Sequence, residues 1–463
     1  MVGRGVFGGL QDRGLGHGPA RDRRRRTRRA GHHHARRNGV QPLIRAAHER
    51  PAGQRRAVRF CAGQKNCAPG RHLRRPVSGC RYDARMDSLV ATMVEQVRAA
   101  VADRTPLRIR GGGSKDFHGL ALHGQLLDTR MLRGIVSYAP SELVVTVRAG
   151  TPLAELEAAL AEQGQCLPFE PPHFARGATD SATVGGMVAA GLSGPARARA
   201  GAVRDYLLGV TLLNGRAELL RFGGQVMKNV AGYDVSRLMV GAWGTLGLLT
   251  ELSLKVLPVA PGEATLRFEC SQAEALRKLH AWGGQPLALD ASCWLQDDEG
   301  QGRLYVRLRG AVAAVESACK TMGGTRIDNA SAAADWAACR EQTLPWFSAR
   351  AAHPELALWR LSLPATAPVM PLPGQPLLEW HGALRWLQAP ESAGAALRAA
   401  ARAAGGNASI FIAASADRSG ASGHGASGQF DWPSTALEQI HARLKHSFDP
   451  SGIFNPGRMV RDW

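Results

Sequence analysis

The sequence predicts an α+β fold built from two successive modules, and three observations lead to this prediction. From Met86 onward, short runs of β-forming residues alternate with helical patterns and glycine-rich loops. After Pro258 the order becomes strand, helix, strand, strand, helix, which is half of a ferredoxin-like pattern, and a second round follows. The chain has 463 residues, which is room for about three domains of ordinary size, so a single small module is excluded.

The first module is expected at residues 86–258. It opens with a helix at 86–101, where leucine, valine and methionine recur on one face at helical spacing. The strands expected after this helix lie at 107–110, 135–138, 142–149, 207–213, 216–222 and 246–258.

Two local signals in this module predict particular backbone shapes. A helix at 151–164 should have Thr151 as its N-cap, Pro152 as its first residue and Gly164 as its terminator. The Asn214-Gly215 pair lies between two apolar runs and predicts a hairpin with a type I′ turn, because both residues tolerate the positive φ that this turn requires.

The second module is expected at residues 259–430, and residues 431–463 form a C-terminal helix and tail. Ser271 and Glu274 have the spacing of a capping box, and Thr435 and Glu438 repeat that spacing at the last helix. The Gly/Ser-rich segment 415–429 has the composition of a flexible loop. The strands expected here lie at 265–269, 287–295, 303–310, 356–364, 377–388 and 408–414, and the helices at 271–284, 311–324 and 391–406.

The net charge of +20 is concentrated at the N-terminus. Residues 1–85 contain 22 Lys and Arg against 4 Asp and Glu, which leaves 36 basic and 34 acidic residues in 86–463. A nucleic-acid-binding function inferred from the total charge is therefore disfavoured, because the body of the chain is nearly neutral. A polybasic arm for nucleic acid or an acidic surface stays open for the first 85 residues.

Residues 1–85 have the composition of a disordered basic extension. They are rich in Arg and Gly and show no sustained hydrophobic period, so they cannot bury enough apolar surface to offset the entropy of ordering. They fit neither a secretory signal, which needs an apolar segment after its basic start, nor a typical transit peptide. We expect the native chain to begin at or near Met86.

The composition also excludes several other classes. No apolar run approaches the ~20 residues of a membrane span. The eight cysteines form no C-x-x-C pair, so we expect reduced structural thiols in a cytoplasmic protein, no iron-sulfur cluster held by this chain and no metal site.

Three glycine-rich blocks are the candidates for chemistry. The first, RGGGSKDFHG at 110–119, follows a strand and exposes backbone N–H groups as an anion-binding loop does, although it is not a P-loop and a plain flexible turn is the alternative. The second, 181–196, contains no charged residue and is rich in Gly and Ala. This composition indicates that the backbone closely approaches a flat ligand or a diphosphate, and a tightly packed helix junction is the alternative.

The third block has Gly241, Gly244 and Gly247 spaced three apart before an apolar strand. No catalytic triad order, paired carboxylates or H-E-x-x-H motif accompanies it. Hydrolysis and metal catalysis are disfavoured, and cofactor binding is the remaining interpretation.

Taken in this order, the blocks resemble the FAD-binding E subunits of bacterial glycolate oxidases, within the PCMH-type or vanillyl-alcohol oxidase family of flavoproteins. The resemblance implies a PCMH-type FAD-binding domain of two α/β subdomains, followed by a ferredoxin-like α+β cap domain. It covers essentially all of residues 86–463. The segments that carry it are PLRIRGGGSKDFHG (106–119), LPFEPPHF (167–174), TVGGMVAAGLSGPAR (183–197), GAVRDYLLGV (201–210), RFGGQVMKNVAGYDVSRLMVGAWGTLGLLTELSLKVLP (221–258), GALRWL (382–387) and FDPSGIFNPGRM (448–459).

The resemblance also implies which residues bind FAD. The first diphosphate loop would be 110–115, the second would comprise 183–186 and 191–194, and 203–205 would lie beside them. Residues 244–250 would line the adenine and diphosphate side. His118 departs from the position of the histidine that holds FAD covalently in some relatives, so we expect noncovalent FAD. The implied cofactor-binding residues are Arg110, Gly111, Gly112, Gly113, Ser114, Lys115, Pro171, Thr183, Val184, Gly185, Gly186, Gly191, Ser193, Gly194, Val203, Arg204, Asp205, Gly244, Gly247, Leu249, Asn455 and Arg458.

The catalytic residues are not identified by the sequence. Related subunits of the D-lactate and glycolate type carry an H-x-G-D-G-like motif for metal and base, and this chain lacks it. Oxidation of a 2-hydroxy acid needs a cation for the carboxylate, a base for the hydroxyl proton and a hydride acceptor. The residues considered for these roles, each more often structural, are His173, Lys228, Tyr233, Arg237, His381 and Arg458.

The expected function is therefore that of the FAD-binding subunit of a complex that oxidises glycolate to glyoxylate. The implied partners are a second FAD-binding subunit and an iron-sulfur subunit, with no nucleic acid and with membrane contact only through these partners, at the cytoplasmic face of the inner membrane. Two alternatives stay open: a stand-alone FAD-dependent 2-hydroxy-acid oxidoreductase, and a noncatalytic assembly subunit of the same fold.

Overall fold

The computed structural model describes residues 80–119, 123–175, 181–224, 234–297, 299–414, 430–431 and 434–460. The predictions for residues 1–79 and for the Gly/Ser segment 415–429 lie outside the described residues. All the described residues belong to one unit of the chain, Pro76–Trp463.

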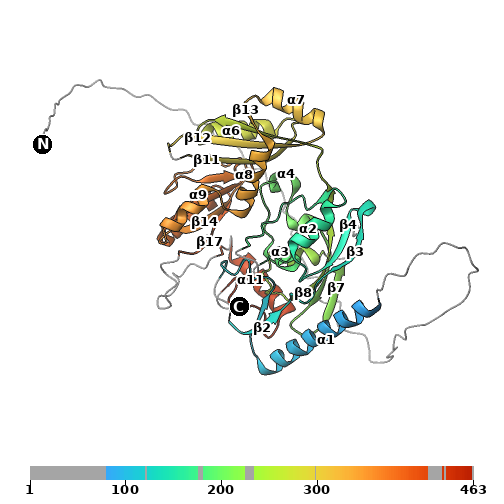
Figure 1. Ribbon diagram of the computed structural model, residues 1–463. Coiled ribbons are helices and arrows are strands. Elements are labelled where there is room, and N and C mark those ends of the chain that lie inside the picture. The colour runs from blue at the N-terminus through green and yellow to red at the C-terminus, as the bar shows by residue number, and fades with distance from the viewer. Residues whose placement is uncertain are drawn as a thin grey trace, which may run out of the picture. The chain divides into compact units, whose positions relative to one another are not determined.

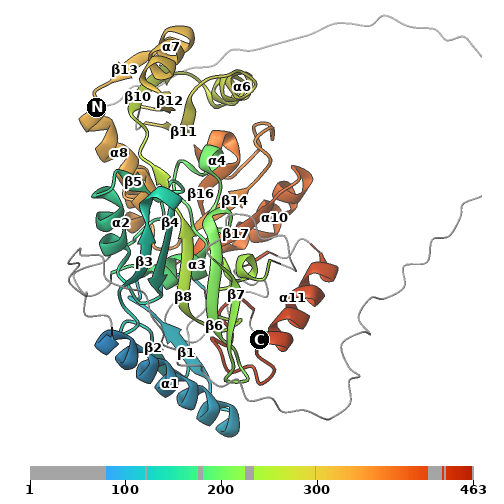
Figure 2. The ribbon, with the colours of Figure 1, turned by 90° about the vertical axis from the view of Figure 1, so that its right-hand side faces the viewer.

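The first layer of the fold is a helix on a short parallel ladder. Helix α1 (Cys80–Asp103) begins six residues before the expected helix, and the extension at 1–85 stays a prediction. The strands β1 (Leu107–Arg110) and β2 (Gln125–Asp128) pair in parallel. Figure 2 shows α1 lying along this pair, and its apolar face packs into a cluster that includes Val97, Leu107, Leu127 and Phe454.

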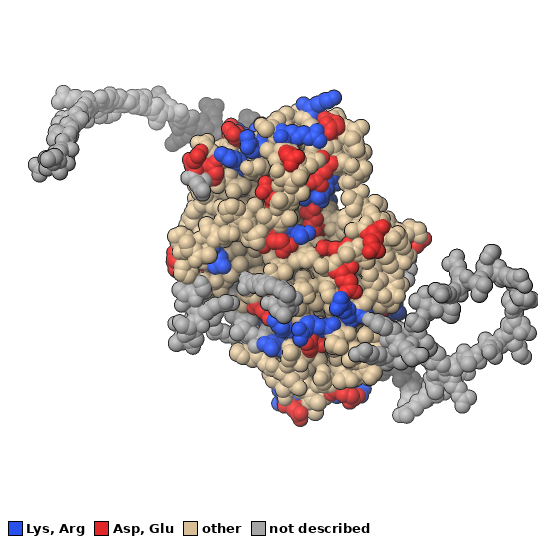
Figure 3. All heavy atoms as spheres, in the orientation of Figure 1, with Lys and Arg blue, Asp and Glu red and all other residues tan. Residues whose placement is uncertain are grey.

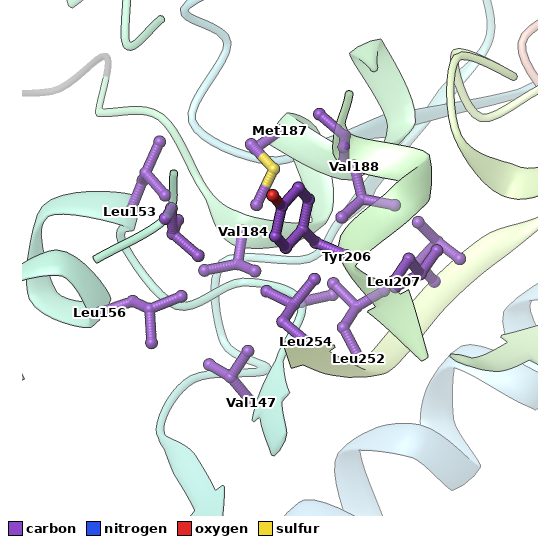
Figure 4. Close-up of a cluster of buried hydrophobic side chains, with 14 of the residues drawn as sticks. Val147, Leu153, Leu156, Val184, Met187, Val188, Tyr206, Leu207, Leu252 and Leu254 are labelled. Carbon is purple, nitrogen blue, oxygen red and sulfur yellow. The ribbon is translucent and has the colours of Figure 1, made fainter. Parts of the chain in front are cut away.

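A five-stranded antiparallel sheet forms the second layer of this module, with the order β3-β4-β8-β6-β7. Figure 1 shows helices α2 and α3 beside this sheet, and Figure 4 shows Val184, Met187 and Val188 of α3 packed with Tyr206, Leu252 and Leu254. The elements are β3 (Ile135–Ala139), η1 (Pro140–Glu142), β4 (Val144–Arg148), α2 (Leu153–Ala161), β5 (Gln165–Cys166), α3 (Val184–Ala190), α4 (Arg197–Ala200), α5 (Val203–Tyr206), β6 (Leu207–Leu213), β7 (Leu219–Gly223), η2 (Ser236–Met239), β8 (Leu248–Lys255) and β9 (Leu257–Pro258).

Two of the predicted local signals are wrong in detail. Pro152, and not Thr151, is the N-cap of α2, because the Thr151 hydroxyl instead accepts a hydrogen bond from the Gly134 N–H at 2.9 Å. The hairpin turn spans 214–218 and has its positive φ at Ala217. It is held by the Asn214 side-chain oxygen, which accepts from two backbone N–H groups and so replaces the type I′ geometry with an Asx-type turn.

The second module is an eight-stranded antiparallel sheet made of two ferredoxin-like halves joined edge to edge by β11 and β15. One half has the order β13-β10-β12-β11 and the other β15-β16-β14-β17. The elements are β10 (Gly262–Glu269), α6 (Gln272–Gly283), β11 (Leu289–Gln296), β12 (Gly302–Gly310), α7 (Val312–Met322), β13 (Thr325–Ile327), α8 (Asn329–Glu341), α9 (Pro345–Ser348), η3 (Ala349–Ala352), β14 (Ala357–Ser362), β15 (Leu377–Glu379), η4 (Trp380–Gly382), β16 (Leu384–Ala389), η5 (Glu391–Ala393), α10 (Gly394–Ala403) and β17 (Asn407–Ile412).

The chain returns to the first module through α11 (Thr435–Phe448), whose N-cap is Ser434 rather than the expected Thr435. The buried Lys445 ammonium donates to the Asp449 carboxylate and to the carbonyls of Thr245 and Phe454. The tail then pairs with β1 through Leu107. The domain boundaries at 258 and 430 stay predictions.

The surface of the described residues shows no dominant charge on the face in Figure 3, where acidic and basic side chains are interspersed. None of the helices in the described part of the chain combines the length and the hydropathy of a membrane span.

Candidate functional site

A pocket lies where β1, α3, β8 and the C-terminal tail meet. We call it the glycine pocket. Of the residues expected to bind the cofactor, those that line it are Arg110, Gly111, Gly112, Gly113, Ser114, Lys115, Thr183, Gly185, Gly186, Gly244, Gly247, Leu249, Asn455 and Arg458.

The first wall of the glycine pocket is the loop that leaves β1. Its glycines are required by packing: a Cβ on Gly112 would lie 1.5 Å from the Ser181 carbonyl oxygen, and Gly113 has a φ of +77°. Among the described residues, none of the backbone N–H groups of 111–115 donates a hydrogen bond within the chain. A run of free N–H groups of this kind forms a nest for an anion such as a diphosphate.

Three cationic side chains surround this loop. Arg110 donates to Asp116 at 2.7 Å, and the buried Arg458 guanidinium donates to the Lys115 carbonyl at 2.9 Å. Burial lowers the pKa of Lys115 to about 8, against the opposing effect of Glu341, and burial lowers the pKa of Arg458 to about 10. Both groups are therefore mainly cationic at neutral pH, which favours an anionic ligand in the pocket.

The second wall is the start of α3. Thr183 is the N-cap, and its hydroxyl accepts from the Gly186 N–H at 3.2 Å. The N–H groups of Val184 and Gly185 donate to carbonyls of Thr151 and Ala149. Since these donors are already used, the start of α3 contributes shape rather than free hydrogen-bond donors.

The third wall is the segment 242–249, and Asn455 joins it to the first wall. Its side-chain oxygen accepts from the Ile109 N–H and its amide donates to the Trp243 carbonyl, both at 2.8 Å. Gly244 has a φ of +74°, and a Cβ there would lie 2.5 Å from the Asn455 amide nitrogen. The tail residue and the glycine therefore define the edge of the pocket together.

Eight of the expected cofactor-binding residues lie outside the glycine pocket. Val184 and Val203 are buried in the core, and Gly191 closes α3 with a φ of +64°. The Asp205 carboxylate accepts from the Ala202 N–H in α5. The remaining residues outside the pocket are Pro171, Ser193, Gly194 and Arg204, of which Ser193 and Gly194 line a second pocket.

Sequence reasoning missed part of the lining of the glycine pocket, whereas Leu246 and Leu248 fall in the expected range 244–250. The missed apolar residues carry no motif of their own, because apolar residues at strand and helix positions are expected in any core. The apolar residues missed are Ile109, Ala149, Ala189, Met239, Ala242 and Trp243, and the polar residues missed are Asp116 and Thr129.

His118 is a buried residue that does not line the glycine pocket. Its Nδ1 lies 2.9 Å from the Phe411 carbonyl, and its ring stacks on Trp243 with 4.4 Å between the ring centres. Burial lowers the pKa of His118 to about 4, and the hydrogen bond to Phe411 opposes this shift. The imidazole is therefore neutral and held in packing contacts.

The other residues considered for catalysis do not converge. His173 contacts Glu157, Arg237 pairs with Asp234 at the surface, and His381 contacts Ser292. Lys228 and Tyr233 lie outside the described residues. Among the residues described, no group of three or more His, Cys, Asp and Glu could hold a metal ion.

Comparison with known proteins gives consistent matches. Residues 90–223 match the family described as FAD binding domain. The chain is 46% identical to the glycolate oxidase subunit GlcE of Escherichia coli over 370 residues, 80% of this chain and 97% of that protein. It is 30% identical to the glycolate oxidase subunit GlcD of Bacillus subtilis over 165 residues, 35% of this chain and 34% of that protein.

A solved structure, an alkyldihydroxyacetonephosphate synthase, aligns with a TM-score of 0.51 and 14% identity, and it covers 79% of this chain and 74% of the other. At this level of identity the likeness concerns the fold alone. It agrees with the mixed helix and sheet content described above.

Proposed function

Because the chain belongs to the family of the glycolate oxidase subunit GlcE, we propose that it is the FAD-binding subunit of a complex that oxidises glycolate to glyoxylate. It is an FAD-dependent oxidoreductase of the class that acts on the CH–OH group of 2-hydroxy acids. The observation that carries the proposal is the run of free backbone N–H groups at 111–115, which faces a pocket flanked by cations.

The residues of the glycine pocket fit FAD. Free N–H groups in the first loop would hold the diphosphate, and Lys115 and Arg458 would balance its charge. Ala149, Leu248 and Leu249 offer apolar contact for the flat parts of the cofactor. When bound, FAD supplies the acceptor for the hydride that leaves the alcohol carbon.

The remaining eight expected cofactor residues stay proposals, and they lie outside the glycine pocket: Pro171, Val184, Gly191, Ser193, Gly194, Val203, Arg204 and Asp205. We also propose that FAD is held noncovalently. The buried, stacked and hydrogen-bonded environment of His118 supports this, because a neutral imidazole in such packing is not presented to the pocket.

The chain works as one subunit of a glycolate oxidase complex, as its relative GlcE does by name. We propose that the second flavin-binding subunit is of the GlcD type and that an iron-sulfur subunit completes the complex, which would contact the membrane only through these partners. The absence of the H-x-G-D-G-like motif supports a division of labour, in which another subunit supplies the metal and base.

The test is co-expression of this chain with its two partners, followed by glycolate-dependent reduction of a dye. We expect FAD in the purified chain, little turnover by the chain alone and full turnover by the complex. Full turnover by the isolated chain would support the stand-alone alternative, and a complex that turns over equally well with an FAD-free form of this chain would support the assembly role.

A further inference from the structure

A second pocket lies between the end of α3 in the first module and the sheet of the second module. We call it the Arg360 pocket. Its polar lining comprises Ser193, Arg340, Gln342, Arg360 and Glu379, and Trp380 and Phe174 are among its aromatic walls. It is smaller than the glycine pocket, so a ligand there would have to be small.

The Arg360 guanidinium has no hydrogen-bond partner or ion-pair partner among the described residues, and its Nε is fully buried. Arg307 and Arg385, the two arginines of the same sheet that are buried as whole residues, both make hydrogen bonds. Arg307 pairs with Glu170 and Asp290 at 2.7 Å, and Arg385 donates to two carbonyls. A buried cation without a partner is costly, and a bound anion would satisfy it.

The Ser193 hydroxyl is a second unsatisfied group in the same pocket. Its oxygen is buried and makes no hydrogen bond in the described residues. A hydroxyl donates one hydrogen bond and accepts others, so it complements a carboxylate or an alcohol. Two orphaned polar groups in one small pocket point to a ligand rather than to two unrelated defects.

The charges of the pocket favour an anion. The guanidinium carbons of Arg197 and Arg360 lie 4.3 Å and 5.3 Å from the centre of the Trp380 ring. Burial and the nearby charge of Arg197 lower the pKa of Arg360 to about 10, which keeps it cationic. Arg340 is already paired with Glu341 at 2.8 Å.

Glu379 is the carboxyl group that lines the pocket, and it is only partly charged. Its two oxygens accept from Trp386 Nε1 at 2.6 Å and from Cys339 Sγ at 3.2 Å. Burial raises its pKa to about 7, which the hydrogen bonds and the charge of Arg360 oppose. It therefore leaves part of the positive charge of the pocket uncompensated at neutral pH.

The Arg360 pocket and the glycine pocket lie close together. Helix α3 lines the glycine pocket at its start, and Ser193, just after its end, lines the Arg360 pocket. The Lys115 ammonium of the glycine pocket lies 5.5 Å from the centre of the Phe174 ring, which is a wall of the Arg360 pocket. The Phe174 side chain therefore separates a ligand in the Arg360 pocket from the Lys115 ammonium of the glycine pocket.

From these observations we infer that the Arg360 pocket binds a small monocarboxylate, with the carboxylate on the Arg360 guanidinium and the Ser193 hydroxyl, and that binding is accompanied by proton uptake at Glu379. This deepens the proposed function and rests on it only for the choice of 2-hydroxy and 2-oxo acids as the ligand class. The site itself is argued from the unsatisfied groups and their charges.

The proton uptake follows from the charges that face Glu379. These are Arg360, Glu170 and the Cys339 thiol, with the Trp386 N–H as the neutral donor. A bound carboxylate neutralises Arg360 and adds a like charge, and both effects favour the protonated form of Glu379. Affinity should therefore fall as pH rises above 7, by up to about tenfold per pH unit.

The test is titration calorimetry on the full-length FAD-loaded chain, with sodium glycolate and sodium acetate as the probes and neutral glycolamide as the control ligand. We expect both carboxylates to bind and glycolamide not to bind. Arg360→Gln should weaken carboxylate binding by about tenfold or more, because a charge-assisted hydrogen bond is lost. Arg326→Gln, which removes an exposed arginine paired with Glu316 in the same module, is the matched control and should bind as the parent does.

Two milder variants keep the test decisive if Arg360→Gln does not fold. Ser193→Ala should weaken glycolate binding several-fold, and Glu379→Gln should bind carboxylate without the pH dependence. Equal heats in phosphate and Tris buffers would show that no proton is taken up. Binding of glycolamide as tight as that of glycolate, or Ser193→Ala and Arg360→Gln binding like the parent, would overturn the proposal.

Acetate binding requires no turnover, so its result is separate from the dye assay of the complex. A chain that binds acetate through Arg360 but gives an inactive complex would contradict the proposed function and support this site. A complex that oxidises glycolate while the chain binds no carboxylate would do the reverse.

Discussion

The glycine pocket is formed mainly by backbone groups, whereas the Arg360 pocket is formed mainly by side chains. The glycine pocket is shaped by backbone, with N–H groups at 111–115 and glycines that leave space where a side chain would intrude. The Arg360 pocket is shaped by side chains, with Arg360, Glu379 and Ser193 brought together from three separate elements. The difference shows how one chain can recognise a cofactor by shape and a small anion by charge.

The difference also predicts how each pocket responds to substitution. A backbone-shaped pocket is sensitive to an added Cβ. Its amide N–H groups do not titrate, so its affinity for FAD should change little with pH until the pH reaches the pKa of Lys115, about 8. A side-chain-shaped pocket tolerates changes in volume at its rim but depends on protonation. The predictions below compare these responses.

The largest effect is expected from Gly112→Ala. The added Cβ would lie 1.5 Å from the backbone carbonyl oxygen of Ser181, so two backbone segments must separate. We expect a loss of at least about 3 kcal/mol in the free energy of unfolding, since overpacking that moves backbone exceeds the usual cost of an added methylene. Thermal and denaturant unfolding of the apo-protein measure it.

Gly283→Ala is the control for this substitution, because a Cβ there meets no atom within 4 Å and the residue ends an ordinary helix. It should leave the melting temperature nearly unchanged. A Gly112→Ala protein as stable as this control would mean that the loop at 111–115 is free to move and that its backbone does not define the pocket.

Much of the fold could be predicted from the sequence because its signals are local. The two rounds of elements in the second module were visible in the sequence, although the second round, from β14 to β17, has no α-helix between its first two strands. Helix α8 was missed, although Asp328 caps it and Ala332, Trp336 and Cys339 share its buried face. Its alanine-rich sequence has little amphipathic contrast, and this helix supplies part of the Arg360 pocket.

The same difference explains what could be predicted of the two pockets. Consecutive glycines after a strand are visible in a sequence, so the loop at 110–115 was identified. Ser193, Arg360 and Glu379 are separated by long stretches of chain and each is ordinary in its own segment. Only the tertiary structure shows that Arg360 lacks a partner while Arg307 has two.

The second largest effect is the change of folding stability with pH that we expect from Glu379 in the Arg360 pocket. The pKa of Glu379 is raised to about 7 by burial, so between pH 4.5 and 7 the folded state holds a proton that the unfolded state has lost. Stability should therefore fall as pH rises through this range, by about 3 kcal/mol in total. Below the pKa of Glu379 in the unfolded chain, the carboxyl group is protonated in both states, so it no longer lowers the free energy of unfolding.

The measurement is the free energy of unfolding at several pH values for the parent and for Glu379→Gln. The amide can still accept from Trp386 Nε1, and it does not titrate, so the difference between the two curves should decline with pH and then level off. If the difference in unfolding free energy between the parent and Glu379→Gln is constant across the pH range, Glu379 has an ordinary pKa. The two pockets would then not differ in their dependence on pH.

A smaller effect is expected from Gly186→Ala in the glycine pocket. A Cβ there would meet only the Thr183 hydroxyl, at 3.1 Å, and alanine is about 1 kcal/mol better than glycine within a helix. The apo-protein should therefore be as stable as the parent or slightly more stable. If the FAD diphosphate approaches this wall, FAD affinity should fall by about tenfold, which is about 1.4 kcal/mol.

Fluorescence titration of the apo-protein with FAD, together with apo melting, separates the two roles of glycine. Loss of affinity at unchanged stability identifies Gly186 as part of the binding surface. Normal FAD affinity in a destabilised apo-protein would instead assign this glycine to packing.

The smallest effect is expected at His118, which lies between the two pockets. It stacks on Trp243 of the glycine pocket and contacts the carbonyl of Phe411, a residue of the Arg360 pocket. Because its imidazole is neutral and buried, with a pKa lowered to about 4, we expect it to form no bond to FAD. Acid precipitation should release all of the yellow cofactor into the supernatant, and His118→Ala should retain FAD while losing some thermal stability through the vacated ring space. Flavin that stays with the precipitated parent but not with the variant would show that this histidine belongs to the cofactor site and that the packing between the two pockets opens far enough to present it.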